Sequence, residues 1–308
     1  LAPEEVETLI TLPIETSMNG ATGVERVRSA SSIGFSIVWV EFGWETQTYT
    51  ARQIVSEKLQ QVTAQFPKDV KSSMGPISSI MGEIMLIGMT SENPDVSPLD
   101  LRSIADWEVR QRLLALPGIA QVAVIGGDQK QFQVLIDPHK LRYYGLSLRD
   151  IEEALENANV NSTGGFELTA NNEYLIRNLG RIQTLDDLAD SVIPKTISHE
   201  APALTLRQVA EIRLGGPLAK RGDASVSGKP GVILSIQKQP GADTIALTNR
   251  VNKELESIRA TLPKGVAVHD DLFRQSVFIE NAIENIKHAL RDGAIMVAII
   301  LFVFLLNV

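Results

Sequence analysis

The sequence predicts an α+β fold made of two similar split βαβ units, the second interrupted by an insertion, followed by the start of a transmembrane helix. Three observations lead to this prediction. Helix and strand periodicities alternate along the chain, one helix-and-proline pattern recurs at a constant offset, and the last residues form an apolar run. We therefore expect a membrane-tethered pair of α/β sandwiches.

The first part of the chain shows helical and strand patterns in alternation. The expected elements are a helix, the two strands of a hairpin, a second helix and a buried strand, at 3–18, 24–30, 35–42, 49–66 and 84–89. Pro13 leaves the second half of the first helix uncertain. The hairpin turns near Gly34, and Pro67 ends the second helix.

The next part begins with a capping box, Ser97 with Asp100, and has proline at the first helical position. The expected elements are a helix, a second hairpin and another helix, at 98–116, 119–125 with 131–136, and 148–158, and the last helix is capped by Ser147 with Asp150. Gly126 and Gly127 suit the tip of that hairpin better than a phosphate-binding loop, because no helix begins directly after them. A loop or domain boundary is expected at 157–172, which is rich in Gly, Asn, Ser and Thr.

The later chain repeats the pattern of the first helix-and-proline segment. The residues Val55, Leu59, Val62, Phe66, Pro67 and Val70 recur at one constant offset as Val251, Leu255, Ile258, Leu262, Pro263 and Val266. A strand at 232–237 precedes the repeat, as 35–42 precedes the first copy. The repeat predicts a second sandwich interrupted by an insertion at about 160–219. The insertion has strands expected at 174–179 and 204–214 and a short helix capped by Thr184.

The C-terminal residues predict a helix that enters a bilayer. The run 294–306 has no polar residue, but a full span needs roughly 20 apolar residues, so length alone leaves a buried core helix as the alternative. Before this run, apolar residues follow helical spacing with charged residues off the stripe: Ile279, Ile283, Ile286 and Leu290. This continuity favours a soluble helix that continues into the membrane.

Composition excludes several classes of protein. The 308 residues, 44% of them hydrophobic, are enough for two or more domains. A net charge of -8 without a Lys/Arg cluster argues against nucleic-acid binding. With no cysteine the chain has no disulfide and no thiolate metal site. No hydrolase, phosphate-loop, dinucleotide or zinc-protease motif is present, so we expect neither catalytic residues nor a cofactor.

Two clusters contain metal-ligand chemistry. His269, Asp270 and Asp271 are adjacent, and imidazole and carboxylate groups bind divalent cations. Neighbours on an extended segment point to opposite faces, so a solvated strand end is the better interpretation. The second cluster is Met81, Met85 and Met89, which lie on one side of a predicted strand. The remaining candidates are isolated: Met74, His139 and His199 in loops, and His288.

The three strand methionines suggest thioether ligation of Cu(I), but their apolar neighbours favour packing in a core. Met74 is interpreted in the same way. The histidines have no partner ligands nearby in the sequence. We therefore expect no metal site in this chain.

Short motifs spread over the whole chain carry a family resemblance. They are 23–31, 34–36, 74–78, Asp106-Trp107, Leu116-Pro117-Gly118, Ile136-Asp137-Pro138, 144–147, 164–165, 173–177 and 206–210. Together they resemble the heavy-metal efflux branch of the resistance-nodulation-division permeases. The resemblance implies ferredoxin-like porter subdomains and a docking insert.

The resemblance also implies domain boundaries. They are 1–118 for a first porter subdomain lacking its first strand, 119–160 and 220–272 for the second, 161–219 for the docking insert, and 273–308 for an amphipathic helix with transmembrane helix two. Within the insert we expect an arm that reaches a neighbouring protomer, carried by Gly164, Gly165, Tyr174 and Arg177.

The function implied is secondary active transport and not catalysis. By resemblance, the parent protein exports heavy-metal cations by proton antiport across the bacterial inner membrane, and this segment is mostly periplasmic. The implied partners are two further protomers in a homotrimer, a periplasmic adaptor (membrane fusion) protein, an outer-membrane channel and the metal cargo. Metal-binding and proton-relay residues are expected outside this segment.

Two alternatives stay open at this stage. One is a multidrug exporter of the same superfamily, which an aromatic content of 5% disfavours because drug clefts are lined by aromatic residues. The other is a binding ectodomain anchored to the membrane by one helix. Saturable ligand binding by this chain alone would distinguish the ectodomain.

Overall fold

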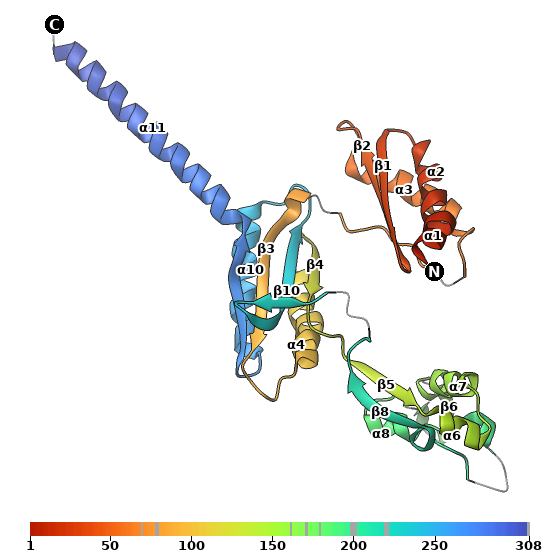
Figure 1. Cartoon of the computed structure of the whole chain (residues 1–308). Helices are drawn as coiled ribbons and strands as arrows, with labels where there is room; N and C mark the ends of the chain where they lie inside the picture. The colour runs from red at the N-terminus through yellow and green to blue at the C-terminus, as the bar shows by residue number, and fades with distance from the viewer. Residues whose placement is uncertain are drawn as a thin grey trace. The chain divides into compact units, whose positions relative to one another are not determined.

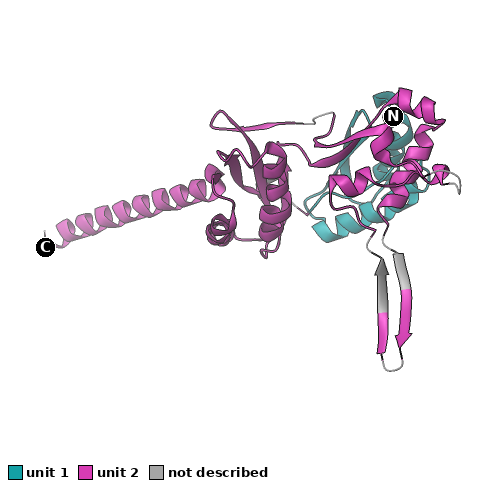
Figure 2. Ribbon diagram, turned by 90° about the horizontal axis from the view of Figure 1, so that it is seen from below, with its two compact units in different colours: residues 1–76 teal, residues 77–308 magenta. Residues whose placement is uncertain are grey.

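The computed structural model describes residues 1–68, 70–77, 80–160, 162–169, 172–178, 180–197, 202–218 and 222–306. The chain divides into two compact units, Leu1–Pro76 and Ile77–Val308, which Figure 2 colours teal and magenta. Figure 1 labels the elements of both units. The predicted α+β character holds in each unit.

The first unit consists of a helical segment, a hairpin and a second helix. Its elements are α1 (Pro3–Val6), η1 (Glu7–Thr11), α2 (Leu12–Asn19), β1 (Val24–Ser32), β2 (Phe35–Phe42) and α3 (Thr48–Thr63). Pro13 does not end the first helical segment. The turn before it widens to a π turn, which relieves the clash between a proline ring and the carbonyl four residues earlier.

The hairpin is joined to the first helical segment through hydroxyl groups. β1 pairs with β2 from Val24↔Phe42 to Ser32↔Phe35, and Gly34 takes a φ of 65° at the turn as predicted. The Thr11 hydroxyl, which is buried, lies 2.8 Å from the Ser31 hydroxyl and 2.7 Å from the Ser36 hydroxyl. These bonds satisfy a buried polar group and hold the helix against the sheet.

The apolar face of α3 does not meet a closed core. Val62 is buried, but Val55 and Leu59 line an apolar cavity of about 660 Å³ together with Met18 and residues of β2. The sequence pattern predicted the helix correctly. The two-stranded sheet of this unit leaves that helix face only partly covered.

The second unit contains a complete split βαβ sheet. Its strands are β3 (Glu83–Ser91), β4 (Ile119–Ile125), β9 (Ala224–Val226), β10 (Lys229–Lys238) and β11 (Val266–Arg274), in the order β11-β3-β10-β4 with β9 added to β10. Every pairing is antiparallel. The strands β3 and β4 therefore run parallel with β10 between them, which is the split βαβ arrangement.

Two helical segments follow the strands of this sheet. They are α4 (Pro98–Ile104), η3 (Ala105–Val109) and α5 (Arg110–Leu114) after β3, and α10 (Thr244–Thr261) after β10. They bury residues at helical spacing against the sheet: Leu101, Ala105, Val109, Leu113, Leu247, Val251, Leu255 and Ile258. Each large aliphatic side chain buried in this way contributes about 1.5–3 kcal/mol.

The prediction of a second hairpin is wrong. β4 pairs with β10, from Ile125↔Ile233 onward, whereas β5 (Gln131–Ile136) pairs with β8 (Ala210–Gly215) in another sheet. Gly126 and Gly127 have positive φ, as hairpin turns require, but they redirect the chain between sheets. A Cβ on Gly126 would lie 2.3 Å from the Ala224 Cβ, so close packing and not a hairpin explains this glycine.

The insertion runs from β5 to β8 and has a core of its own. Between those strands lie α6 (Pro138–Tyr144), α7 (Leu148–Ala158), β6 (Ser162–Thr169), β7 (Asn172–Asn178), α8 (Leu185–Ala189), η4 (Pro194–Thr196) and α9 (Leu206–Val209). Ile151 of α7 and Leu188 of α8 share the core with Ile193 and Leu206. Part of the segment expected as a loop forms β6, and the segment expected as a strand at 204–214 begins with α9.

The compact units and the buried clusters group these elements. The first compact unit ends at Pro76, and β3 to α5 pack with β10, α10 and β11. The segment from β5 to α7 packs with the insertion. Capping and periodicity define a helix locally, but they carry no information about which of two cores the helix joins.

The C-terminal helix α11 (Gln275–Leu306) is continuous and exposed (Figure 1). Its 32 residues extend about 48 Å at 1.5 Å per residue. By length and composition it is a candidate membrane span, because an 18-residue stretch of it has a mean hydropathy of 2.3, and none of that stretch is buried. The alternative of a buried core helix is therefore wrong.

Candidate functional site

The predicted arm is a two-stranded ribbon within the insertion. β6 and β7 pair from Ser162↔Asn178 to Thr169↔Asn172, and they pair with no other described strand (Figure 2). Near the end of the pairing, the Thr169 hydroxyl donates a 3.1 Å hydrogen bond to the carbonyl of Asn172. The ribbon therefore depends on its own cross-strand bonds.

The two glycines of the arm form a bulge. The register passes from Thr163↔Arg177 to Phe166↔Leu175, so Gly164 and Gly165 oppose one residue of β7. Gly165 has a φ of 79°, a conformation typical of glycine in bulges. The sequence placed these glycines before the strands, and the structure places them inside β6.

The arm carries exposed apolar side chains. Phe166 is 63% exposed, Leu168 is 78% exposed and Tyr174 is 54% exposed. A two-stranded ribbon has no core to cover such residues, which indicates a surface used for contact. Of the four predicted arm residues, Gly164, Gly165 and Arg177 meet at the bulge, whereas Tyr174 lies nearer the turn, opposite Glu167.

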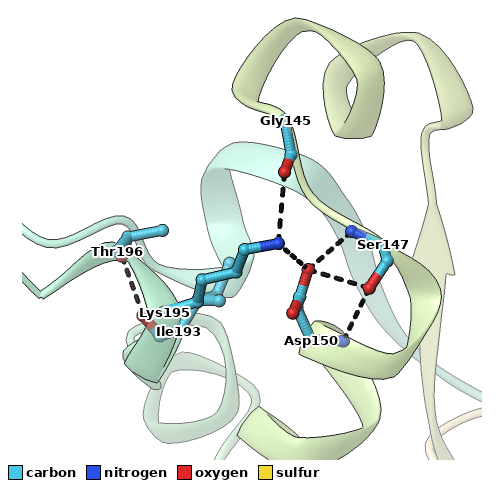
Figure 3. A network of polar contacts seen from close by, with 6 residues as sticks. All are labelled: Gly145, Ser147, Asp150, Ile193, Lys195 and Thr196. Atoms are coloured by element: carbon cyan, nitrogen blue, oxygen red, sulfur yellow. Dashed lines mark hydrogen bonds and ion pairs between the residues drawn. The ribbon is translucent and has the colours of Figure 1, made fainter.

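The body of the insertion is tied together by a polar network (Figure 3). Lys195 Nζ donates a 2.8 Å hydrogen bond to Asp150 Oδ2 and a 3.4 Å bond to the carbonyl of Gly145. Asp150 also accepts hydrogen bonds from the backbone N–H and hydroxyl of Ser147, completing the predicted capping box. The network joins η4 to the start of α7.

These contacts shift the acidity of Asp150. The hydrogen bond from Lys195 is the largest cause and the Ser147 backbone N–H the next, and together they lower the pKa of Asp150 to about 2. The carboxylate is thus charged at physiological pH. The sequence identified the cap, but Lys195 lies 45 residues away and no local signal points to it.

The three residues of the 269–271 cluster lie in different surroundings in the structure. His269 Nε2 lies 2.9 Å from the Thr90 hydroxyl, and Asp270 pairs with Arg259 at 3.2 Å and with Arg274. Asp271 is exposed. Across the described ranges, no group of three His, Cys, Asp or Glu residues is arranged to hold a metal ion.

Two of the three strand methionines belong to the core. Met85 and Met89 are fully buried in the sheet, as the packing interpretation predicted. Met81 does not share their side of the strand, because it lies in the 3-10 turn Ile80–Gly82 and is 73% exposed. Met74 lines the cavity of the first unit.

The histidines remain scattered where the structure describes them. His139 is in the first turn of α6, not in a loop, and its Nδ1 lies 3.1 Å from the Arg142 guanidinium. His288 Nε2 lies 3.1 Å from Glu284 on α11. His199 lies outside the described residues.

A cleft that sequence reasoning missed lies in the second unit. It has a volume of about 540 Å³ and is lined by one helical face, by 129–132 and by Leu214 of β8. The helical face contributes Arg102, Asp106, Trp107 and Arg110. Trp107 was noted in the sequence only as part of a motif. Its spacing of four residues from Ser103 and three from Arg110 was the available signal for a shared helical face.

The sequence profile of the AcrB/AcrD/AcrF family matches residues 1–308. The chain belongs to the AcrB/AcrD/AcrF family. The resemblance to its heavy-metal efflux members is confirmed by the relatives described next.

Curated members of the family align with the whole chain. Protein HelA of Legionella pneumophila is 37% identical over 313 residues, and the cobalt-zinc-cadmium resistance protein CzcA of Cupriavidus metallidurans is 33% identical over 314 residues. The cation efflux system protein CusA of Escherichia coli K12 is 34% identical over 311 residues. The alignments cover 100% of this chain and 29% of each relative.

A solved member shares the fold. An X-ray crystal structure of a heavy metal efflux pump superposes with a TM-score of 0.82 at 25% identity, over 95% of this chain and 29% of that chain. The prediction of an α+β porter fold with an insert is thereby confirmed. The relatives are named as efflux and resistance proteins, in agreement with the expectation of a transporter and not an enzyme.

Proposed function

We propose that this chain is the periplasmic part of a proton-driven exporter of heavy-metal cations in the bacterial inner membrane. The observation that carries the proposal is the alignment of the whole chain with relatives named for cation efflux and metal resistance. The exposed apolar helix α11 supports attachment to a membrane. The chain spans 29% of the length of these relatives, so the complete protein performs the transport.

We further propose roles for the observed groups of elements. The sheet of β3, β4, β10 and β11 with its helices acts as one porter subdomain, residues 1–76 belong to the other, and β5 to β8 form the docking insert. The groupings of core residues support this assignment.

The cargo passes this part of the protein without being tightly held. Support comes from the pairing of His269 with Thr90 and of Asp270 with two arginines, and from the burial of Met85 and Met89 in the sheet. Ions such as Zn²⁺ need three or four converging ligands. The metal-binding and proton-relay residues are proposed to lie elsewhere in the complete protein.

The complete protein is proposed to work as a homotrimer with a periplasmic adaptor protein and an outer-membrane channel. The β6–β7 ribbon serves in this assembly as an arm that contacts a neighbouring protomer. Its exposed Phe166, Leu168 and Tyr174 support this role, because these three side chains lie outside the core of the insertion.

Metal tolerance of a host lacking its own metal exporters tests the proposed function. Expression of the full-length protein with its adaptor and channel should raise the growth-inhibiting concentration of one or more heavy-metal cations and leave drug tolerance unchanged. Replacing 163–177 by a short Gly-Ser turn removes the arm and spares the buried residues Leu188 and Ile193. This variant should lose trimers and tolerance together. Drug tolerance without metal tolerance would contradict the proposal.

A further inference from the structure

Strand β11 leads into the long helix α11 without a loop. β11 ends at Arg274 and α11 begins at Gln275. Of the 32 residues of α11, all of which the structure describes, only Ser276 is buried. The direction of the helix therefore depends on the few residues at its root. A tilt of about 5° at the root moves the far end by about 4 Å, because the helix is about 48 Å long.

A bulge in β11 lies just before this root. The register with β3 passes from His269↔Gly88 to Phe273↔Leu86, so three residues of β11 oppose one residue of β3. A bulge bends its strand and changes the direction of the chain that follows. The conformation of the bulge at 270–272 therefore sets the angle at which the chain enters α11.

A carboxylate in the bulge bridges two arginines. Asp270 Oδ1 pairs with Arg259 of α10 at 3.2 Å, and Asp270 Oδ2 pairs with Arg274 at the end of β11. Arg274 Nε donates a 2.6 Å hydrogen bond to the carbonyl of Asp270, and Arg259 donates a 3.2 Å bond to the carbonyl of Val268. All three charged side chains are partly buried, so water and salt screen them less than they screen a surface pair.

Packing holds the same bulge against β3. A Cβ added to Gly88 would lie 2.9 Å from Leu272 Cδ1 and 2.8 Å from a methyl group of Val226, so the missing side chain at Gly88 makes room for both. At the root of α11, Gln275 Nε2 donates a 3.2 Å hydrogen bond to the carbonyl of Met81 in the turn before β3. The bulge and the helix root are thus both fixed to the sheet.

We propose that Asp270 is a positioning residue for transport. By holding Arg259 and Arg274 together it locks the bulge, so that α11 and the sheet move as one body. Without the carboxylate the two guanidinium groups repel each other and the bulge loosens. The inference rests on the proposed function as a proton-driven exporter, because movement within the membrane has to reach the porter subdomain to move cargo outside it. Asp270 acts through the direction of α11 and not by touching cargo.

Electron paramagnetic resonance of the full-length protein in nanodiscs measures the direction of α11. With any cysteine outside this segment replaced, spin labels at Glu256→Cys on α10 and Asn281→Cys on α11, two exposed positions, report the distance between the helices. One labelled protomer is diluted in unlabelled protein. Asp270→Asn keeps the size of the side chain and removes its charge, and should widen the distance distribution about twofold. Asp271→Asn makes the same change at the adjacent exposed residue and should match wild type.

Transport kinetics in proteoliposomes show whether this position matters for the function. Asp270→Asn should lower the maximal rate of metal transport about tenfold and leave the half-saturating metal concentration within about twofold, because conformational steps set the rate and the cargo ligands are proposed to lie elsewhere. Asp270→Glu, which keeps the charge, should recover part of the rate. Hydrogen exchange of β4 and β10 amides should be unchanged, which separates positioning from loss of the fold.

A second variant tests the root of α11 without changing any charge. Gly88→Ala places a methyl group against Leu272 and should widen the same distance distribution, because Leu272 has to leave its place over β3. This variant keeps the ion pairs of Asp270. A wild-type distribution in Gly88→Ala together with a wild-type distribution in Asp270→Asn would show that the bulge does not direct the helix.

The outcomes separate this inference from the proposed function. A wild-type distance distribution in Asp270→Asn overturns the inference, and so does a widened distribution with an unchanged transport rate. If the wild-type protein moves no metal, the proposed function fails, and the distance distribution alone then decides whether Asp270 positions α11. A widened distribution together with a lower maximal rate supports both.

Discussion

Leu59 and Leu255 occupy equivalent positions in the repeated sequence pattern, yet the structure predicts different costs for replacing them. Leu255 is fully buried between α10 and the sheet of the second unit. Leu59 lines the 660 Å³ cavity of the first unit. Leu255→Ala removes buried apolar atoms and leaves a void, which should cost about 3 kcal/mol. Leu59→Ala enlarges an existing space and should cost about 1 kcal/mol.

Native-state hydrogen exchange of the full-length protein measures the two costs separately, because each unit reports through its own strands. Leu255→Ala should speed exchange of β3 and β10 amides by roughly a hundredfold, and Leu59→Ala should speed exchange of β1 and β2 amides by about fivefold. Glu256→Ala, at an exposed position next to Leu255, is the control and should change little. Equal losses for the two leucines would refute this account of the cores.

Three further predictions concern the insertion, the chain crossing and the cargo. Asp150 has a pKa of about 2 in the folded chain against an ordinary value of 3.8, so its contribution to stability is present above pH 3.8 and is lost as pH falls through 2. Asp150→Asn should therefore reduce the dependence of the insertion's stability on pH between 3.8 and 2, as measured by circular dichroism during acid unfolding. Gly126→Ala places a Cβ against Ala224 at positive φ and should cost at least 1–3 kcal/mol in thermal unfolding, whereas Gly20→Ala, with open space around it, should be nearly neutral. Titration calorimetry should find no submicromolar binding of Zn(II) or Cu(I) to this chain; stoichiometric binding abolished by His269→Ala or Met85→Ala would contradict the assignment of these residues to packing.

Local signals in the sequence predicted most elements of the fold. The capping pairs of Ser97 with Asp100, Ser147 with Asp150 and Thr184 with Asp187 all form, because each bond lies within one turn of its helix. The capping box of Thr205 with Gln208 was overlooked, although the same rule identifies α9. The start of a helix can therefore be predicted from the sequence wherever a side chain in its first turn caps it.

The pairing of strands that are distant in the chain could not be predicted from the sequence. Two strands joined by a short turn that begins with two glycines fit a hairpin, but the partner of β4 is β10, more than 100 residues away in the chain. The alternation of apolar and polar residues predicts which face of a strand is buried, and turn residues predict where the strand ends. Neither pattern identifies the strand that pairs with it in the sheet.

The candidate site was predicted only in part. The glycines and apolar residues of the arm were visible because they occur together in the sequence. The cleft beside Trp107 was not visible, since it joins one helical face to 129–132 and to Leu214, about 80 residues further along the chain. Asp270 of the 269–271 cluster pairs with Arg259 and Arg274, which the sequence did not reveal.

Metal transport by the purified full-length protein tests the central claim most directly. Proteoliposomes with an imposed proton gradient and an enclosed metal-sensitive dye should accumulate a heavy-metal cation only while the gradient lasts, and an ionophore that collapses the gradient should stop it. Transport of organic dyes without metal, or metal movement that is indifferent to the proton gradient, would contradict the account.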